Sequence, residues 1–497
     1  MSTPMLMEIL KRKSLRVDLA PGFRDPLTEL VRDVAPFAKR LGLRVLLVGG
    51  TVRDLVVHGC FSGEWDLVVF GDGDGDGDGA GKLAEEMART WKWREPVSFP
   101  RFGTHLVIGK GCRVELSQAR LRTKLRDLDP DPLTSDALSR DFTLNALYVD
   151  LTGMGPKGPG PIRSPLDSPF HSVDVLDPTG RGIADLHDGI LKTPLPGKIT
   201  FVEDPLRVFR AARFKAVNGY RLDPAIGRAV GAAIHRLPEI APERIREELD
   251  RILLSREPSL GLEPLGRWSA FSSVAPEIQA MVGFVQDTPW HFPDLFRHTL
   301  RVVDRCPPDV GLRWAALLHD CGKPLTRVHA EGGDIYHGHE SVGADAAGNV
   351  LKRLKCSRHR VKEVQSLVRL HMVHYQDEWS DRAVGRFIRR SGSHLDKLLD
   401  LVESDSLALR RRRGKLEELG RLRERIASIR ERLPAPASPL DGRKIMELLN
   451  LETGALVGRA KEAAAEAVGD GRIPPDEDAA RAFLLEWFAQ VEMSGRS

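Results

Sequence analysis

The chain is poor in cysteine and lacks any long hydrophobic run. Its 497 residues include only five cysteines, which have no paired spacing, so the sequence predicts neither a disulfide framework nor a zinc knuckle. No apolar run is long enough to cross a membrane, and the first residues carry lysines without the apolar core of a signal peptide. We therefore expect a cytoplasmic protein without membrane contact.

A large excess of charge of one sign is also absent. The formal net charge is +4, which is small for this length, although 29% of the residues are charged and 41% are hydrophobic. These proportions are ordinary for a chain that buries a hydrophobic core, and the length predicts several domains. Any affinity for nucleic acid must therefore come from local basic patches.

The apolar periodicity changes along the chain. Strand and turn patterns dominate to about residue 190, and helical periodicity dominates beyond about residue 200. In the first part, the Gly-Asp tract over residues 71–79 predicts a solvated loop. The segment 153–172, rich in proline and glycine, predicts an insertion in a hairpin loop.

A glycine pair followed by two alternating carboxylates is the most informative motif. Gly49 and Gly50 end a hydrophobic run and would let backbone N–H groups approach phosphate, and Arg53 lies at the start of a predicted helix. Glu64 and Asp66 lie at i and i+2 of a predicted strand, so their side chains share one face. The pattern predicts a site that binds a triphosphate and a divalent cation.

Residues 49–66 resemble the catalytic signature of the tRNA nucleotidyltransferase and bacterial poly(A) polymerase family, within the polymerase-beta-like superfamily. The family form is Gly-Gly-x-Val-Arg-Asp followed by Asp-x-Asp. This chain has Glu64 at the first carboxylate, and its connector around His58 and Gly59 is one residue longer. Glutamate reaches one methylene further, and Mg²⁺ requires near-octahedral oxygen ligands, so we expect Mg²⁺ binding to survive this change.

A third carboxylate, Glu115, lies on a predicted strand shortly before Arg120. Glutamates at strand ends are common, but the family places a carboxylate on a neighbouring strand before an arginine. The resemblance therefore implies that Glu64, Asp66 and Glu115 are the catalytic residues. They would support two-metal catalysis, in which one ion lowers the pKa of the attacking 3′-hydroxyl and the other stabilises the leaving pyrophosphate.

The stretch 139–146 resembles the family box Arg-Arg-Asp-Phe-Thr-Ile-Asn-Ala, with Ser139 in place of the first arginine. Arg140 can pair with phosphate, whereas Asp141 and Asn145 can bind the sugar hydroxyls of a ribonucleotide. The structural alternative is that Asp141 caps a turn and that Asn145 satisfies backbone groups.

Residues 203–207 resemble the Glu-Asp-x-x-Arg box of the family, which pairs with the incoming base. On one helix, Asp204 and Arg207 would share a face. A carboxylate accepts from the exocyclic amine of cytosine or adenine, and a guanidinium donates to ring nitrogen or carbonyl, so the pair would reject guanine and uracil. Arg210 and Arg213 extend the basic face. A helical salt bridge is the structural alternative.

A separate set of histidines and aspartates resembles an HD domain, with its specific core over residues 317–324. The expected ligands are His298, His319, Asp320, His339, His371 and Asp405. Such a set fits a divalent transition metal and supports metal-assisted phosphoester hydrolysis. The alternatives are buried core histidines and an HD domain that serves only as a scaffold.

Basic residues in the helical region predict contacts with an RNA backbone, although a solvated helix face is the alternative. The candidates are Lys352, Arg353, Lys355, Arg358, Arg360 and Lys362. The cluster over residues 410–415 is equally compatible with both interpretations.

The resemblance covers about residues 30–490 and implies an α+β fold. We expect a polymerase-beta-like head with a small mixed sheet, followed by an elongated all-α body that includes the HD domain. The expected segments are an N-terminal extension at 1–28, a catalytic head at 29–195, a helical neck for base recognition and RNA binding at 196–288, an HD domain at 289–433 and a helical tail at 434–497.

The implied activity is template-independent addition of CMP and AMP to the 3′ end of tRNA from CTP and ATP, with Mg²⁺ as cofactor. A transition metal in the HD domain and a monomer or homodimer are further expectations. Within the family, a poly(A) polymerase, a CC-adding enzyme and an A-adding enzyme remain alternatives. Another class of function is an HD phosphohydrolase whose head only binds RNA.

Overall fold

The structure is a computed structural model that forms two compact units, Met1–Ile240 and Ala241–Ser497, which are described in turn. It describes residues 14–19, 21–59, 64–71, 77–100, 103–109, 112–119, 131–152, 172–286, 294–331, 333–373, 375–409, 413–432, 438–469 and 472–494.

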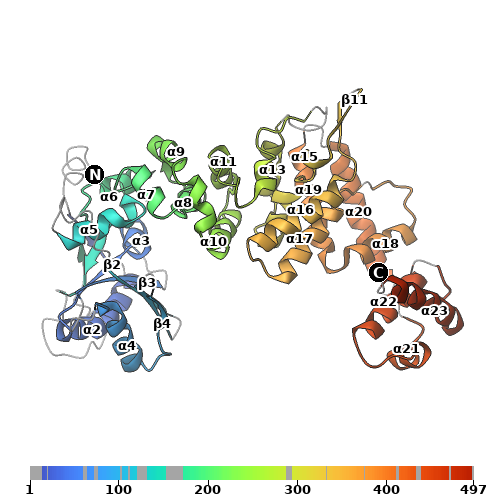
Figure 1. Cartoon of the computed structure of the whole chain (residues 1–497), viewed down its shortest axis with the longest axis horizontal. Coiled ribbons are helices and arrows are strands. Elements are labelled where there is room, and N and C mark those ends of the chain that lie inside the picture. The colour runs from blue at the N-terminus through green and yellow to red at the C-terminus, as the bar shows by residue number, and fades with distance from the viewer. Residues whose placement is uncertain are drawn as a thin grey trace. The chain divides into compact units, whose positions relative to one another are not determined.

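The first unit is built on a mixed β-sheet whose described strands have the order β1-β8-β7-β2-β3-β6-β5-β4 (Figure 1). The strands are β1 (Ser14–Asp18), β2 (Arg44–Val48), β3 (Glu64–Phe70), β4 (Val97–Phe99), β5 (Thr104–Gly109), β6 (Cys112–Gln118), β7 (Tyr148–Asp150) and β8 (Ser172–Leu176). The β3–β6 pair is parallel, and the other neighbours are antiparallel. This order places β3 and β6, which carry the predicted carboxylates, side by side.

Helices cover both faces of this sheet. They are α2 (Pro21–Arg40), α3 (Gly50–His58), α4 (Gly79–Trp91), α5 (Pro132–Ser139), η3 (Thr143–Asn145), α6 (Gly182–His187), α7 (Gly197–Glu203), α8 (Arg207–Asn218), α9 (Pro224–Val230) and η5 (Ile234–Glu239), and β9 (Ile190–Leu191) pairs with β10 (Arg221–Leu222). Helix α4 packs against β3, β5 and β6. On the opposite face, Val48 and Val68 pack against Leu133 and Ala137 of α5.

The helices form because their apolar residues recur at helical spacing. In α2, Leu27, Val31, Val34 and Ala38 are all buried, at i, i+4, i+7 and i+11. At the start of α4, the Asp78 carboxylate accepts a hydrogen bond from the Gly81 N–H and caps the helix. Burial of one apolar stripe per helix thus fixes these helices against the sheet.

The second unit is helical in its described residues except for one small hairpin. Its elements are α10 (Pro242–Leu253), α11 (Ser259–Arg267), α12 (Pro276–Gln279), α13 (Leu295–Arg305), α14 (Val310–Leu318), α15 (Lys323–Thr326), β11 (Val328–Ala330), β12 (Gly333–Ile335), α16 (His339–Arg353), α17 (Arg358–Leu370), α18 (Asp381–Ser391), η6 (Gly392–His394), α19 (Leu395–Ala408), α20 (Arg413–Arg432), α21 (Gly442–Leu449), α22 (Ala455–Gly469) and α23 (Glu477–Ser494). Asp294, Asp309 and Ser357 cap α13, α14 and α17 through their side chains.

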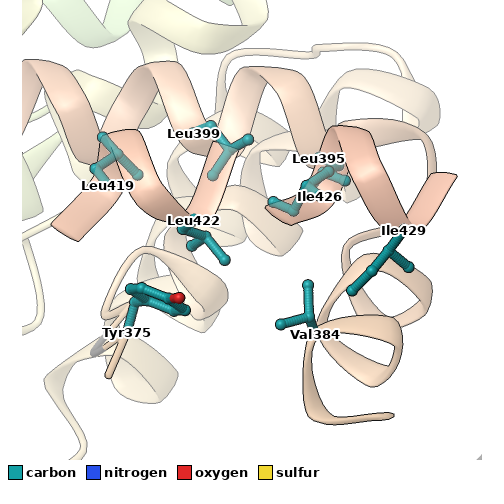
Figure 2. Close-up of a cluster of buried hydrophobic side chains, with 8 residues drawn as sticks. All are labelled: Tyr375, Val384, Leu395, Leu399, Leu419, Leu422, Ile426 and Ile429. Atoms are coloured by element: carbon teal, nitrogen blue, oxygen red, sulfur yellow. The ribbon is translucent and has the colours of Figure 1, made fainter. Parts of the chain in front are cut away.

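A hydrophobic cluster joins α18, α19 and α20 (Figure 2). Its buried members are Tyr375, Val384, Leu395, Leu399, Leu419, Leu422, Ile426 and Ile429. Leu399 lies on α19, the helix that also carries Asp405, and Leu422 lies on α20. The cluster therefore holds α19, and with it Asp405, in place.

The structure changes one expected boundary and confirms one expected hairpin. Residues 1–28 were expected to form a polar extension, but β1 pairs in antiparallel register with β8 and α2 begins at Pro21. The sheet of the head thus includes part of that segment.

Strands β7 and β8 form the predicted hairpin. The insertion at 153–171 lies outside the described residues, as do residues 72–76 of the Gly-Asp tract. No described helix combines the length and apolar character needed to span a membrane.

We predict that Leu422→Ala lowers the free energy of unfolding of the second unit by about 2–5 kcal/mol, because it leaves a cavity at a fully buried position. Denaturant unfolding followed by tryptophan fluorescence measures this change, since Trp379 packs against the same cluster. The control is Leu485→Ala, which removes the same atoms from a side chain that is 52% exposed and should change stability by less than about 0.5 kcal/mol. Equal effects of the two variants would contradict the assignment of this core.

Candidate functional site

The predicted carboxylates lie together on one face of the head sheet. Asp66 is the register partner of Glu115 across the parallel β3–β6 pair, and Glu64 is the partner of Arg113. Register partners point to the same face of a sheet, so the two strands form one acidic row. The Arg113 guanidinium lies 3.9 Å from Glu64 Oε1 and 3.8 Å from Glu115 Oε2. Sequence reasoning had not singled out Arg113.

The charge of this row favours a bound cation. Burial, and then the neighbouring Glu115, raises the pKa of the Asp66 carboxyl to about 6, and Arg140 only partly opposes this shift. A carboxylate destabilised by burial and by a second carboxylate is stabilised by a nearby positive charge. The oxygen ligands of Glu64, Asp66 and Glu115 therefore fit a hard divalent cation.

Gly49 and Thr51 fix the approach of α3 to the acidic strand. Gly49 has φ +73° and ψ −137°, a backbone conformation that favours glycine, and a Cβ atom there would lie 3.2 Å from Asp66 Oδ2, which would press on this carboxylate. The Thr51 hydroxyl donates to the Glu64 carbonyl (3.1 Å) and accepts from the Asp66 N–H (3.3 Å). Thr51 was missed from the sequence, where a polar residue directly after the glycine pair was the available signal.

A chain of hydrogen bonds connects three of the predicted motifs. Arg53 Nη1 donates to Asn145 Oδ1 (3.2 Å), and Asn145 Nδ2 donates to Asp141 Oδ1 (3.0 Å). Arg210 Nε of α8 then donates to Asp141 Oδ2 (2.8 Å). Burial alone would raise the pKa of the Asp141 carboxyl, but Arg210 and the Asn145 amide outweigh it and hold this pKa below its usual range. Asp141 is thus a buried, ionised centre of the site.

The Phe214 ring provides a second contact between Arg53 and Arg210 and also contacts Arg213. The guanidinium carbons of Arg53, Arg210 and Arg213 lie 5.4, 5.8 and 4.7 Å from the centroid of the buried Phe214 ring. These distances are within the range of cation–π attraction. The contact keeps three arginines close together, which suits a polyanionic ligand.

Arg140 is held by two buried partners. Its Nε donates to Asp136 Oδ2 (2.9 Å) and to the Tyr148 hydroxyl (3.0 Å), and the Tyr148 hydroxyl donates to the same Asp136 oxygen (2.8 Å). The Arg140 side chain remains 20% exposed, and its charge acts on Asp66. This arrangement presents a preorganised cation toward the acidic row.

The structure corrects the predicted geometry of the base-recognition pair. Asp204 ends α7 and Arg207 begins α8, so the two residues do not share a face of one helix. Pro205 provides the reason, because a residue before proline is disfavoured in helical conformation, and Asp204 has φ −137° and ψ 99°. Proline at this position was a signal that the helical expectation overlooked.

Arg207 is buried and makes several hydrogen bonds. Its Nη1 donates to the Thr200 carbonyl (3.1 Å) and to Glu203 Oε2 (3.2 Å), and its Nη2 donates to the Ser139 carbonyl (2.6 Å). Burial lowers the pKa of Arg207 from its usual value. Ser139, the departure from the family box, is itself buried, and its hydroxyl donates to the Asp136 carbonyl (2.7 Å). The second box and the α7–α8 junction are therefore directly connected.

The second unit brings together the six predicted ligands of the HD-like set. Of its histidines, His319, His339 and His371 each place Nδ1 within 2.6–2.8 Å of a backbone carbonyl, at Ala316, Tyr336 and Val368 respectively. A proton on Nδ1 leaves Nε2 free to bind a metal, and this tautomer is typical of metal-binding histidines. His319 Nε2 and His339 Nε2 are buried and receive no hydrogen bond from the residues that the structure describes. The residues therefore fit a metal ion.

Asp320 lies between two groups of ligands. Its Oδ2 is 3.3 Å from His319 Nε2 and 3.8 Å from His298 Nε2, whereas its Oδ1 is 3.5 Å from His339 Nε2 and 3.8 Å from His371 Nε2. Asp405 Oδ1 is 3.0 Å from His298 Nε2. Among the described residues, three or more candidate ligand atoms within 4.8 Å of one another occur only in these two groups, which share Asp320.

Two residues of the predicted core over residues 317–324, which had not been assigned as ligands, also belong to this centre. Lys323 is buried, and its Nζ donates to Asp320 Oδ2 (2.7 Å) and to Gln286 Oε1 (3.1 Å). A Cβ atom on Gly322 would lie 2.1 Å from the His339 carbonyl oxygen, so only glycine allows this close approach. The Gly-Lys pair directly after His319-Asp320 was the available signal.

The predicted RNA-binding residues do not all have the same surroundings. Arg353 forms two hydrogen bonds of 2.9 Å with the Glu277 carboxylate, and Arg360 Nη1 donates to Asp250 Oδ2 (2.8 Å). The exposed remainder consists of Lys352, Lys355, Arg358 and Lys362. Residues 410–412 of the other basic cluster lie outside the described residues.

Three protein families match successive parts of the sequence. The family described as "Poly A polymerase head domain" matches residues 45–192, the "Probable RNA and SrmB- binding site of polymerase A" matches 219–281, and the "HD domain" matches 295–427.

Three relatives span much of the chain. The A-adding tRNA nucleotidyltransferase of Deinococcus radiodurans is 30% identical over 465 residues, covering 89% of this chain and 95% of that protein. The CC-adding tRNA nucleotidyltransferase of Thermus thermophilus is 38% identical over 57% of this chain and 67% of its own length. The multifunctional CCA protein of Xanthomonas campestris is 32% identical over 70% of this chain and 80% of its own.

Solved structures support the fold. The Bacillus stearothermophilus CCA-adding enzyme in complex with CTP aligns with a TM-score of 0.55 at 20% identity, over 94% of this chain and 99% of that one. A CCA-adding enzyme with ATP aligns with a TM-score of 0.54 at 19% identity, over 95% and 99%. Together with the near-full-length relative, these matches show that the chain belongs to the tRNA nucleotidyltransferase and poly(A) polymerase family and carries an HD domain.

Proposed function

We propose that this protein adds CMP and AMP to the 3′ end of tRNA without a nucleic-acid template, using CTP and ATP and releasing pyrophosphate. The observation that carries the proposal is the convergence of the acidic row of β3 and β6 with the chain Arg53–Asn145–Asp141–Arg210. One site thereby combines ligands for a divalent cation with arginines for a triphosphate. Two of the three relatives are named as tRNA nucleotidyltransferases that add A or CC, and the third is named as a multifunctional CCA protein, which supports the same reaction.

The residues of the head would divide the work as follows. Glu64, Asp66 and Glu115 hold Mg²⁺, which when bound supplies Lewis acidity for activating the 3′-hydroxyl and for stabilising the leaving pyrophosphate. Arg140, already fixed by Asp136 and Tyr148, orients the triphosphate and neutralises charge that develops on it. The N–H groups at the start of α3, at Gly50, bind phosphate oxygen.

Recognition of the nucleotide would fall to the second box and to the α7–α8 junction. We propose that Asp141 and Asn145 bind the ribose hydroxyls, either directly or through the arginines that they position. Asp204 accepts from the amine of cytosine or adenine, and Arg207 donates to the ring edge. Guanine and uracil present a carbonyl to Asp204 instead, so they are rejected.

The acceptor RNA would also need a longer basic surface. We propose that Lys352, Lys355, Arg358 and Lys362 bind RNA phosphates, whereas Arg353 and Arg360 contribute mainly through their ion pairs with Glu277 and Asp250. We further propose that the protein acts on tRNA in the cytoplasm, as a monomer or homodimer.

We predict orderly addition that stops at CCA when the protein is incubated with Mg²⁺, CTP, ATP and a tRNA lacking its 3′ CCA. Asp66→Ala should abolish incorporation because it removes the central carboxylate, and Glu447→Ala, which removes an exposed carboxylate from α21, is a control that should retain it. Gel analysis of labelled tRNA gives the result. Stopping at CC, adding A only to a CC end, or adding long A tails to any RNA would each contradict complete CCA addition. Full activity of Asp66→Ala would contradict the site itself.

We also propose that the HD-like centre binds divalent transition metal and hydrolyses a phosphoester. The observation that favours this second activity is the pair of buried ligand groups that share Asp320. His298, His319 and Asp405 would hold one ion, and His339 and His371 the other, with Asp320 between them. Imidazole and carboxylate ligands of this kind suit Mn²⁺, Co²⁺, Ni²⁺ or Zn²⁺.

The prediction for this centre is metal content. After loading with Mn²⁺ or Ni²⁺ and desalting, wild-type protein should retain up to about two ions per chain, His339→Ala about one, and Asp320→Ala few, because Asp320 contacts both ligand groups. His329→Ala is the matched control, since this imidazole is 79% exposed and pairs only with Asp334. Elemental analysis gives the count. Equal retention by wild type and Asp320→Ala would rule out this centre.

A further inference from the structure

The catalytic face of the head sheet continues past the carboxylates onto the edge strands. Glu115 is the register partner of Leu106 on β5, and Leu106 is the partner of Val97 on β4. Two residues away from these positions, Arg113 of β6 is the register partner of Ile108 on β5, and Thr104 of β5 is the partner of Phe99 on β4. Because paired residues share a face, Val97, Phe99, Leu106 and Ile108 lie on the same face as Asp66 and Glu115. These four residues are called the apolar platform below.

Three of the four platform residues are exposed, and Leu106 between them is half-buried. Val97, Phe99 and Ile108 are 50%, 46% and 49% exposed, although apolar side chains of this size are usually buried. On the other face, β5 is covered, because His105 and Val107 are buried and His105 Nε2 lies 3.1 Å from Asp78 Oδ1 at the N-terminus of α4. The residue of β4 on that face, Ser98, is exposed but polar. Apolar exposure is thus confined to the catalytic face.

An exposed apolar edge normally carries a cost. Strand β4 is the last strand of the sheet, and apolar edge strands favour unwanted pairing with other chains. Contiguous exposed apolar groups in a folded protein commonly mark a binding surface. The position of this one, directly beside the catalytic row, indicates which ligand it serves.

The two substrates of the proposed transfer need different sides of the acidic row. Arg53 and Arg210, which suit the nucleoside triphosphate, lie on α3 and α8 and are joined through Asn145 and Asp141, and α3 packs against β2 and β3. The platform lies on the other side, across β5 and β4. Adjacent strands are about 4.8 Å apart, so Leu106 and Val97 follow Glu115 at about 5 and 10 Å. These two distances would suit the last nucleotides of an RNA chain whose 3′-hydroxyl reaches the carboxylates.

We propose that the apolar platform binds the 3′-terminal nucleotides of the acceptor RNA. The inference rests on the proposed transfer and adds to it a primer subsite. A terminal base stacks on Phe99, and riboses pack on Val97, Leu106 and Ile108. Stacking tolerates every base, because every base has a π-face. An acceptor end whose last base changes with each addition needs this kind of recognition rather than hydrogen-bond readout.

The test is RNA binding and steady-state kinetics of Phe99→Ala, with Phe99→Tyr as the conservative variant. The probe is a tRNA acceptor minihelix that carries 2-aminopurine at its 3′ end, whose fluorescence falls when the base stacks. We expect wild type and Phe99→Tyr to quench the probe. Phe99→Ala should lose most of the quenching and raise the KM for minihelix about fivefold or more, with the KM for ATP and CTP unchanged. Val97→Ala should act in the same direction.

The matched control is Val328→Ala, an equally exposed strand valine in the second unit. It should leave quenching and both KM values as in wild type.

Absence of nucleotide incorporation by wild type would refute the proposed function. Incorporation by wild type with unchanged quenching and KM in Phe99→Ala would refute only the primer subsite. A raised KM for ATP or CTP alone would assign the platform to the incoming nucleotide. If Phe99→Ala changed the sedimentation coefficient but not the RNA affinity, the platform would be assigned to a protein interface. This result, like a raised KM for ATP or CTP alone, would overturn the proposal.

Discussion

The buried Asp141 carboxylate is the interaction on which the head depends. It accepts from Asn145 within its own loop and from Arg210 on α8, and through Asn145 it also reaches Arg53 on α3. A buried carboxylate is stable only when it is fully paired, so the loop, α3 and α8 must pack together for this charge to be buried. The same pairing holds Arg210, whose positive charge acts on Asp66 of the acidic row. Fold stability and ligand recognition therefore use one network.

The metal centre of the second unit follows a similar physical rule. Three buried imidazoles each place Nδ1 against a backbone carbonyl, which fixes the tautomer and directs Nε2 toward Asp320. Helices α13, α16, α17 and α19 supply ligands that are far apart in the sequence, and the hydrophobic cluster around Leu399 and Leu422 fixes α19 (Figure 2). In both units, polar groups that are costly to bury are placed where a ligand can satisfy them.

Much of the candidate site could be predicted from the sequence, because its residues occur in short motifs with fixed spacing. The carboxylates of β3 and β6 and the ligands around Asp320 are close together as expected. The helical placement of Asp204 and Arg207 was wrong, because Pro205 breaks the helix. The pairing of β1 with β8 and the apolar platform could not be predicted, since both depend on long-range register that local pattern does not specify. Thr51, Arg113 and Lys323 were missed because single polar residues carry little signal.

The most direct test of the account is equilibrium binding of all four nucleoside triphosphates to wild-type protein and to Asp141→Asn. The account predicts that wild type binds CTP and ATP more tightly than GTP and UTP. It also predicts that Asp141→Asn loses at least about tenfold in affinity for CTP and ATP, because removing the charge releases Arg210 and Asn145. Asp174→Asn, at an exposed position on β8, should bind like wild type. Unchanged CTP and ATP binding by a folded Asp141→Asn protein would contradict the central role of this carboxylate.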